Sequence, residues 1–592
     1  MRSVTLRRRR FTYPGLFSGA LSGVLAAAVA LGVAQLVAGI TGALGSPVDA
    51  IGEVAINHTP IPVKEFAITH FGSRDKDALV TGILVLLVLI AAVAGAAAVR
   101  RLAAGFAILA LFGAAGVAAA VSQPQATGTD ALPTLAGIAV AAAALLILIH
   151  SARAASRPAS LAVTTGPPAT AGIPVADAWV PLDEQLSGLA VRPAAAEPAS
   201  GRELASGPEL SAGRERPAGT GLPPAPPAPP AGPESAPGSN RRRFLLTGTA
   251  VAAVAAAGAG GGQLLLSRFS VASSRAAVRL PAPAVAARAV PAGAQLKIPG
   301  LSPFFTPNAQ FYRVDTDLVV PQVSPESWTL RIDGMVSRPV EVTFAELLRM
   351  PLTEADITLV CVSDVVGGPY NGNARWLGVP LATLLRRAGV QAGADQVLST
   401  GTDGMTISTP LQAILDGRNA LVAVGMNGQP LPVAHGFPAR MVVPGLFGYV
   451  SATKWLTKLT VTTFARQQAY WTQRGYSAQA PIKTESRIDV PKPLAQVKAG
   501  RVPVAGVAWA PHRGISAVQV SVDKGPWHSA QLAAAGGIDT WRQWTWAWDA
   551  TPGLHSLEVR AADGTGAIQT SQEAGPVPNG ASGWDSVVVT AA

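Results

Sequence analysis

A single cysteine, Cys361, is the residue of this chain best suited to bind a soft metal ion. It lies near the carboxyl end of an apolar, β-branched run at 357–362 that predicts a buried strand. The Gly-Gly-Pro sequence at 367–369 then predicts a sharp turn, and Asn371-Gly372 a second one before residues 374–376 lead towards a helix. Without further context, burial as a small hydrophobic residue explains a single cysteine at least as well as metal binding does.

The order of motifs around Cys361 resembles the sulfite oxidase family of molybdenum–molybdopterin enzymes. The family's Val-Cys-Val-Ser series stands at 360–363, Gly-Gly-Pro-Tyr at 367–370 and Gly-Asn-Ala-Arg-Trp at 372–376. In that family one cysteine thiolate binds molybdenum, so the resemblance implies that Cys361 is the metal ligand. It covers about residues 303–590, nearly half of the chain.

Molybdopterin carries a dithiolene, a pterin and a phosphate, so its site needs a thiolate, hydrogen-bond donors and cations. Further family motifs stand at 435–440 (His-Gly-Phe-Pro-x-Arg) and 454–455 (Lys-Trp). Without the resemblance, a lone loop histidine is more often solvated and an arginine a surface charge. With it, cofactor contacts are implied for six side chains besides Cys361: Asn308, Tyr312, Arg375, His435, Arg440 and Lys454.

Two more residues are implied to act on the substrate. Tyr476 matches a tyrosine that hydrogen-bonds to the metal's oxo group or the substrate, and Arg313 stands beside the family's substrate arginine. An ungapped match places Val314 at that arginine, and the insert at 448–453 lacks another arginine of animal sulfite oxidases. Asp364 is interpreted as a turn or capping residue.

The composition predicts a membrane protein with a soluble part. The chain has 592 residues, 49% of them hydrophobic and 14% charged, and a mean hydropathy of +0.33. The formal charge of +11 comes from arginines beside apolar stretches, which indicates topology signals and no nucleic-acid partner. One cysteine excludes intrachain disulfides, a cysteine-ligated iron–sulfur cluster and Cys-x-x-Cys-His haem attachment.

Residues 1–153 contain uncharged stretches long enough for four transmembrane helices, at 11–48, 78–99, 102–129 and 131–151. Arginine clusters place the amino terminus in the cytoplasm. Residues 154–240 are rich in Pro and Ala, which predicts a disordered cytoplasmic linker. Residues 241–267 resemble a twin-arginine export signal kept as an anchor helix. We therefore expect a multi-pass protein of the cytoplasmic membrane whose catalytic domain is extracytoplasmic. If residues 241–267 are an ordinary fifth helix and not an export signal, the orientation is the same.

The remaining half is predicted to hold two domains. After a Pro/Ala tether at 268–300, an α+β molybdopterin-binding domain is expected over 301–480. Its local signals include a capping box at Thr343 and Glu346, a helix at 381–388 before Gly389, and an Asn427-Gly428 hairpin turn. Residues 495–592 alternate as an all-β, immunoglobulin-like sandwich. That region resembles the family's dimerisation domain, which implies a homodimer.

We therefore expect a membrane-anchored oxidoreductase that transfers an oxygen atom on a small sulfur compound, with sulfite oxidation first and sulfoxide reduction as the alternative. No haem is expected, because His58, His70 and His150 form no pair at one membrane depth, so electrons pass to a separate carrier. A cofactor-free binding module on a membrane anchor would leave Cys361 unexplained. A transporter is disfavoured, because the spans hold almost no ionisable residues.

Overall fold

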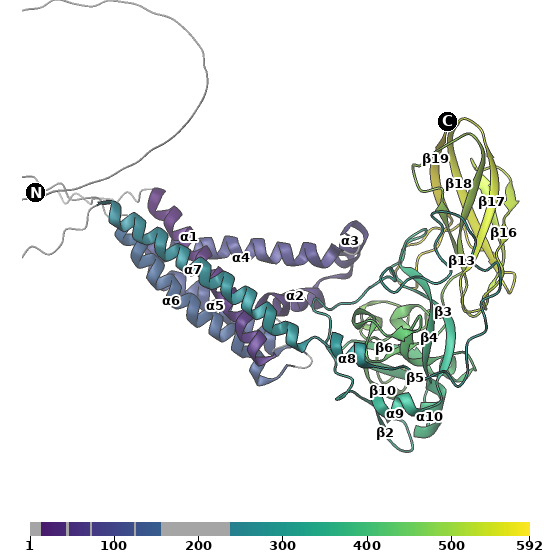
Figure 1. The fold of residues 1–592 in the computed structure, drawn as a ribbon, viewed down its shortest axis with the longest axis horizontal. Helices are drawn as coiled ribbons and strands as arrows, with labels where there is room; N and C mark the ends of the chain where they lie inside the picture. Colours follow the sequence, from purple (N-terminus) through teal and green to yellow (C-terminus); the bar gives the residue numbers. More distant parts are fainter. Residues whose placement is uncertain (1–12, 43–45, 72–73, 124–125, 156–236) are drawn as a thin grey trace, which may run out of the picture. The chain divides into compact units, whose positions relative to one another are not determined.

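The computed structural model describes residues 13–42, 46–71, 74–123, 126–155 and 237–592 (Figure 1). The arginine cluster at 7–10 and almost all of the predicted linker, from 156 to 236, lie outside the described residues. Within the described residues, the amino-terminal part is helical and the carboxyl-terminal part is rich in strands.

Five helical segments are long and apolar enough to cross a membrane, at 15–41, 75–100, 102–121, 128–153 and 242–277. This confirms the expected apolar helices. They correspond to α1 (Tyr13–Thr41), α4 (Asp75–Arg100), α5 (Leu102–Val121), α6 (Leu132–Ala155) and α7 (Pro237–Leu266), the last followed by α8 (Ala272–Ala277).

Two shorter helices, α2 (Pro47–His58) and α3 (Ile61–Phe71), stand where the sequence was interpreted as the end of a span and a loop. Helix α2 begins at a capping box, in which the Ser46 hydroxyl accepts the amide of Asp49 and the Asp49 carboxylate accepts the amide of Ser46. The box and the proline at the first helical position explain why the chain starts a new helix here.

Helices α1 and α4 approach closely through small residues. A Cβ atom added at Gly95 would lie 2.1 Å from the carbonyl oxygen of Gly19 and 2.6 Å from the amide nitrogen of Gly23. Backbones this close leave no room for a side chain, so glycine permits the contact.

The first soluble domain has two sheets, each predominantly antiparallel, with short helices between strands. One sheet has the order β2 (Val340–Thr343), β1 (Thr329–Gly334), β10 (Leu456–Thr462), β5 (Gln396–Gly401), β6 (Thr406–Pro410), with only β1 and β10 parallel. The other has the order β3 (Thr353–Val360), β4 (Asn371–Pro380), β7 (Leu421–Met426), β8 (Gln429–Pro430), and β9 (Arg440–Val442) also pairs with β7.

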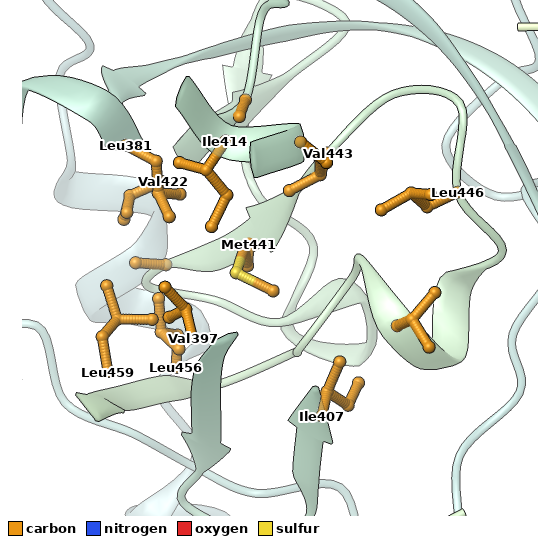
Figure 2. Close-up of a cluster of buried hydrophobic side chains, with 14 of the residues drawn as sticks. Leu381, Val397, Ile407, Ile414, Val422, Met441, Val443, Leu446, Leu456 and Leu459 are labelled. Carbon is orange, nitrogen blue, oxygen red and sulfur yellow. The ribbon is translucent and has the colours of Figure 1, made fainter. Parts of the chain in front are cut away.

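The two sheets share one hydrophobic core. Figure 2 shows Val397, Ile407, Leu456 and Leu459 of the first sheet meeting Val422 and Met441 of the second. The packing is completed by α10 (Leu381–Ala388) and α11 (Leu411–Leu415), which contribute Leu381 and Ile414. Burial of these aliphatic side chains stabilises the frame from which the site loops project.

Most local signals agree with the structure. Helix α9 (Phe344–Arg349) starts at the Thr343–Glu346 capping box, and α10 ends at Gly389, whose φ is 71°. Asn427 and Gly428, with φ of 51° and 76°, form the turn between β7 and β8. One reading was wrong: residues 371–376 belong to strand β4, because Asn371 pairs with Val360 and closes a hairpin around the loop 361–370.

The carboxyl-terminal domain is a sandwich of two sheets. The first has the order β11 (Glu485–Val490), β13 (Gly500–Trp509), β17 (Arg542–Ala550), β16 (Gln531–Leu532). The second has the order β12 (Gln496–Val497), β19 (Asp585–Ala591), β18 (Gly553–Asp563), β14 (Ile515–Val522), β15 (Trp527–Ser529). Residues of both sheets share one core, including Val504, Trp544 and Val559.

The segment expected as a tether is bonded to the first soluble domain. Val271 N donates to the Gln322 side chain (3.1 Å), and the Arg275 guanidinium donates to the carbonyls of Pro430 and Leu431, each at 2.7 Å. Further along, Val285 forms a parallel bridge with Thr353 at the start of β3. These bonds fix the chain on the domain's surface from Val271 onwards.

Candidate functional site

Cys361 directly follows β3 and opens the hairpin loop 361–370. Its amide donates to the carbonyl of Tyr370 (2.9 Å), and its carbonyl accepts the amide of Asp364 (3.1 Å). The Asp364 carboxylate then accepts the Tyr370 amide (2.9 Å) and the Asn371 side-chain amide (2.7 Å). Asp364 thus holds the loop as expected for a turn residue. The loop keeps Cys361 buried, and burial raises the pKa of its thiol to about 11. The thiol therefore needs a bound cation to ionise at neutral pH.

A buried arginine, Arg440, lies in β9. Its guanidinium donates to the carbonyls of His435 (3.2 Å) and Ala452 (3.3 Å) and lies 5.1 Å from the ring centre of Trp376. Its Nε is buried and has no hydrogen-bond partner among the described residues. A buried donor without an acceptor is costly, so this atom is suited to an acceptor that the protein itself does not provide.

His435 and Lys454 lie beside Arg440. His435 Nε2 is 3.3 Å from the carbonyl oxygen of Asn308. Burial, together with the charges of Arg440 and Lys454, lowers the pKa of His435 to about 4, which keeps its ring neutral at physiological pH. Adjacent cations that oppose protonation of a histidine also create a positive potential that favours an anion.

Asp315 is the carboxylate that partly balances this charge. The Lys454 ammonium donates to Asp315 (2.6 Å) and to the carbonyl of Val314 (3.1 Å), and Arg313 Nε donates to Asp315 at 2.7 Å. Burial alone would raise the pKa of Asp315, but Lys454 and Arg313 hold it well below its usual range. Arg313, expected at the substrate, is therefore engaged by a carboxylate that sequence reasoning did not identify.

Tyr312 lies close to Cys361. A Cβ atom added at Gly448 would lie 3.8 Å from the Tyr312 hydroxyl and 3.6 Å from the carbonyl oxygen of Val360. Burial first, and then the neighbouring Cys361, raise the pKa of Tyr312 well above its usual range. The Tyr312 ring stacks on Phe311, with centroids 5.2 Å apart, and Phe311 also contacts His435 edge-on at 5.6 Å. Tyr312 and Phe311 thus lie between the Cys361 thiol and His435, which is beside Arg440 and Lys454.

Tyr476 belongs to an aromatic group. Its ring centre is 5.4 Å from that of Tyr449 and 5.3 Å from that of Trp471. Tyr449, in the 3₁₀ turn Gly448–Val450, donates its hydroxyl to the carbonyl of Ser477 (2.7 Å). Sequence reasoning missed Tyr449; the available signal was its place in the 448–453 insert, which the sequence analysis singled out.

Two predicted contacts have other partners. Arg375 is ion-paired with Asp356 (2.7 Å) and Glu354 (3.8 Å), both on β3, and covers the ring of Phe305 at 5.3 Å. The Asn308 side chain accepts the amide of Asn427 (2.8 Å) and donates to the carbonyl of Met426 (3.3 Å). Their expected contacts with a cofactor stay predictions.

These features fit a cofactor that brings its own metal ligands. In the described part of the chain, no group of three or more His, Cys, Asp or Glu side chains could hold a metal ion. Cys361 alone would therefore depend on ligands from a bound group. The unpartnered Arg440 Nε, together with the Lys454 ammonium, offers donors and positive charge to an anionic portion of that group. A dithiolene with a phosphate meets both requirements.

Comparison with known proteins agrees with this chemistry. The family model described as "oxidoreductase molybdopterin binding domain" matches residues 317–471, which include Cys361, His435, Arg440 and Lys454. The chain is 31% identical to sulfite oxidase from Gallus gallus over 293 residues, which is 42% of this chain and 63% of that protein. Residues 317–471 are therefore a molybdopterin-binding oxidoreductase domain that is similar to the corresponding part of sulfite oxidases.

Other similar proteins carry the names of different reactions. The chain is also 34% identical to an NADH nitrate reductase from Solanum lycopersicum over 194 residues, 28% of this chain and 21% of that one. Among solved structures, the sulfane dehydrogenase SoxCD from Paracoccus pantotrophus matches at 25% identity with a TM-score of 0.41, covering 45% of this chain and 75% of that chain. The chain spans less than two thirds of the sulfite oxidase and the nitrate reductase, so its own activity has to be argued from its site.

Proposed function

We propose that this protein is a membrane-anchored molybdenum–molybdopterin oxidoreductase that transfers an oxygen atom on a small sulfur compound. The observation that carries the proposal is the buried Cys361 thiol in one domain with Arg440, a buried guanidinium whose Nε has no partner among the described residues. The thiol suits the metal, and the guanidinium suits an anionic group of the cofactor.

Different side chains of the site are proposed to hold different parts of the cofactor. When bound, the cofactor supplies a two-electron redox centre and an exchangeable oxygen. Cys361 would be the metal ligand, for which its thiol has to be deprotonated. Arg440 and Lys454 would hold the phosphate, and neutral His435, whose Nε2 donates to the Asn308 carbonyl, would offer its other ring nitrogen as an acceptor. Tyr312, close to Cys361, excludes water from the thiol.

We assign sulfite oxidation as the first candidate reaction and sulfoxide reduction as the second. The second is favoured by a specific feature of the site: Arg313 is already paired with Asp315, which leaves less positive charge for a sulfite anion. Tyr449 and Tyr476 instead offer aromatic faces, which suit a neutral substrate.

The membrane arrangement is part of the proposal. Five apolar helices, with arginines flanking them in the sequence, support a multi-pass protein whose catalytic domain is extracytoplasmic, with α7 as a retained anchor. The two-sheet carboxyl-terminal domain is proposed to be immunoglobulin-like and to form a homodimer. Electrons pass to or from a separate carrier, and no haem or iron–sulfur centre is assigned. A reporter fused after Ala592 should be extracytoplasmic, and one inserted near Gly219 cytoplasmic.

Metal analysis of the full-length protein purified in detergent tests the central claim. The wild type should contain about one molybdenum per chain, and Cys361→Ser should lose both the metal and turnover while keeping its thermal unfolding profile. Val365→Ser, an exposed change in the same loop, is the matched control and should keep the metal. A Cys361→Ser protein with full molybdenum and full activity would remove Cys361 as the ligand.

A further inference from the structure

A polar cavity of about 370 Å³ lies in the carboxyl-terminal part of the protein. Its volume has room for on the order of ten water molecules. Charged and polar side chains from several strands and loops line it, among them Lys483, Glu485, Arg513, Asp563, Gln569 and Ser582. Asp563 is satisfied within the lining, since it accepts hydrogen bonds from Arg513 Nε (2.8 Å) and the Thr484 hydroxyl (2.9 Å).

Glu485 is different from the other lining residues. It is the first residue of β11, its side chain lines the cavity, and the residue is only 7% exposed. It forms no ion pair with Lys483 or Arg513, the cations that share the lining; Arg513 pairs instead with Asp563. Trp509, its partner in strand β13, has its buried indole nitrogen close to the Glu485 carboxyl group, which it helps to hold. A buried carboxyl group that lines a polar cavity and has no ion-pair partner is suited to bind water there.

Strand β11 also borders the loop that holds Cys361. Arg487, two residues after Glu485, donates to the carbonyl of Gly368 (2.6 Å) and to the Asn371 side-chain oxygen (3.1 Å). Asn371 in turn donates to Asp364, whose amide is bonded to the carbonyl of Cys361. The Glu485 carboxyl interacts electrostatically with Asp364 across this boundary. One strand therefore connects the cavity to the loop around the thiol.

The charges around Glu485 set its protonation. Burial raises its pKa to about 8, the negative charge of Asp364 adds to the rise, and Lys483 opposes it. Arg513 and Asp563, which also line the cavity, are paired with each other. At neutral pH the carboxyl group thus holds a proton that it can release, which is the property required of a proton carrier.

The proposed reaction has to move protons to or from a buried site. When a sulfur compound is oxidised, an S–O bond forms with an oxygen that comes from water, and both O–H bonds of that water break. Two protons must then leave, and two electrons pass to the separate carrier. Reduction of a sulfoxide needs the same protons in reverse. We propose that Glu485 relays protons between the Cys361 site and the water of this cavity. The inference rests on the proposed function, because that reaction is what requires the path.

The test uses the full-length holoenzyme in detergent and the variants Glu485→Gln and Glu485→Ala, with Glu573→Gln, an exposed carboxylate of the same domain, as control. Glu485→Gln should slow turnover by at least roughly tenfold with KM and molybdenum content unchanged, and should enlarge the solvent isotope effect. Glu485→Ala should be slowed equally and partly restored by added formate, which fits the cavity and carries protons. Wild-type rates in both Glu485 variants, or losses that follow molybdenum content without rescue, would overturn the relay.

An infrared measurement tests the proton relay independently of the proposed function. Chemical reduction of the holoenzyme should change a carboxylic C=O band in the infrared difference spectrum, and the change should vanish in Glu485→Gln but persist in Glu573→Gln. If the wild type turns over no sulfur compound, the proposed function fails while this band still decides the relay. A reduction spectrum identical in wild type and Glu485→Gln would exclude Glu485 as a proton carrier.

Discussion

Replacing Glu485 by glutamine should stabilise the protein, and the gain should grow with pH. The carboxyl group has an ordinary pKa of 4.5 in the unfolded chain and a pKa of about 8 when buried in the folded protein, where desolvation disfavours the charged form. Between these values the folded state binds more protons than the unfolded state, so stability is present in full below pH 4.5 and is lost as the pH rises towards 8. Glutamine has the same shape and no such dependence.

The size of the effect follows from the two pKa values. Each unit of pH inside the window costs about 1.4 kcal/mol, so the wild type loses roughly 2 to 3 kcal/mol relative to Glu485→Gln between pH 5 and pH 7. Glu485 is almost fully buried, so solvent screening reduces this little. For a domain of roughly 100 residues, such as the carboxyl-terminal sandwich, 1 kcal/mol moves the midpoint of thermal unfolding by about 4–8 °C, so the expected difference is on the order of ten degrees.

Thermal unfolding of the full chain in one detergent, followed at several pH values, measures this difference. Subtracting the wild-type midpoint from that of Glu485→Gln cancels the other titrating groups, which both proteins share. The exposed Glu573→Gln control should show no pH-dependent difference. A gain for Glu485→Gln that is the same at pH 5 and pH 8 would show that burial does not shift this carboxyl group, and the reasoning above would be wrong.

Two further predictions concern the cofactor and the membrane helices. Arg440→Met should weaken retention of the cofactor by roughly tenfold or more, since a charge-assisted hydrogen bond is lost, whereas Arg386→Met, on the exposed face of α10, should not; molybdenum per chain after dialysis measures this. Gly95→Leu should prevent close packing of α1 and α4 and lower the yield of detergent-stable protein, whereas Gly82→Leu, where an added Cβ meets nothing within 4 Å, should be tolerated. Equal behaviour within either pair would contradict the contacts described.

Elements with local causes could be predicted from the sequence. The capping box at Thr343, the glycine end of α10 and the Asn427-Gly428 turn each depend on residues within a few positions, and all three agree with the structure. The turn predicted at Asn371-Gly372 was wrong. This dipeptide belongs to strand β4 because it pairs with β3, and such tertiary pairing outweighs the local preference for a turn.

Partners distant in sequence could not be predicted. Arg375 faces Asp356 because of the register between β3 and β4. No local sequence pattern predicts that ion pair. Asp315 meets Lys454 across 139 residues. The Glu485 cavity likewise forms from segments that are adjacent only once the sandwich has folded. The identity of the cofactor was readable from motifs, whereas the charge balance around it needed the fold.

The fixed start of the soluble part has a consequence for encounters with an electron carrier. Helix α7 ends at Leu266 and the chain is bonded to the catalytic domain from Val271, which leaves residues 267–270 as the free length. Four residues span at most about 14 Å even when fully extended. If α7 is a membrane anchor, this short connection keeps the catalytic domain close to the membrane surface. The domain then cannot move away from the membrane to meet a carrier. The carrier must come to the membrane surface, and the collision rate is then set by its own diffusion and by how much of it is held near that surface.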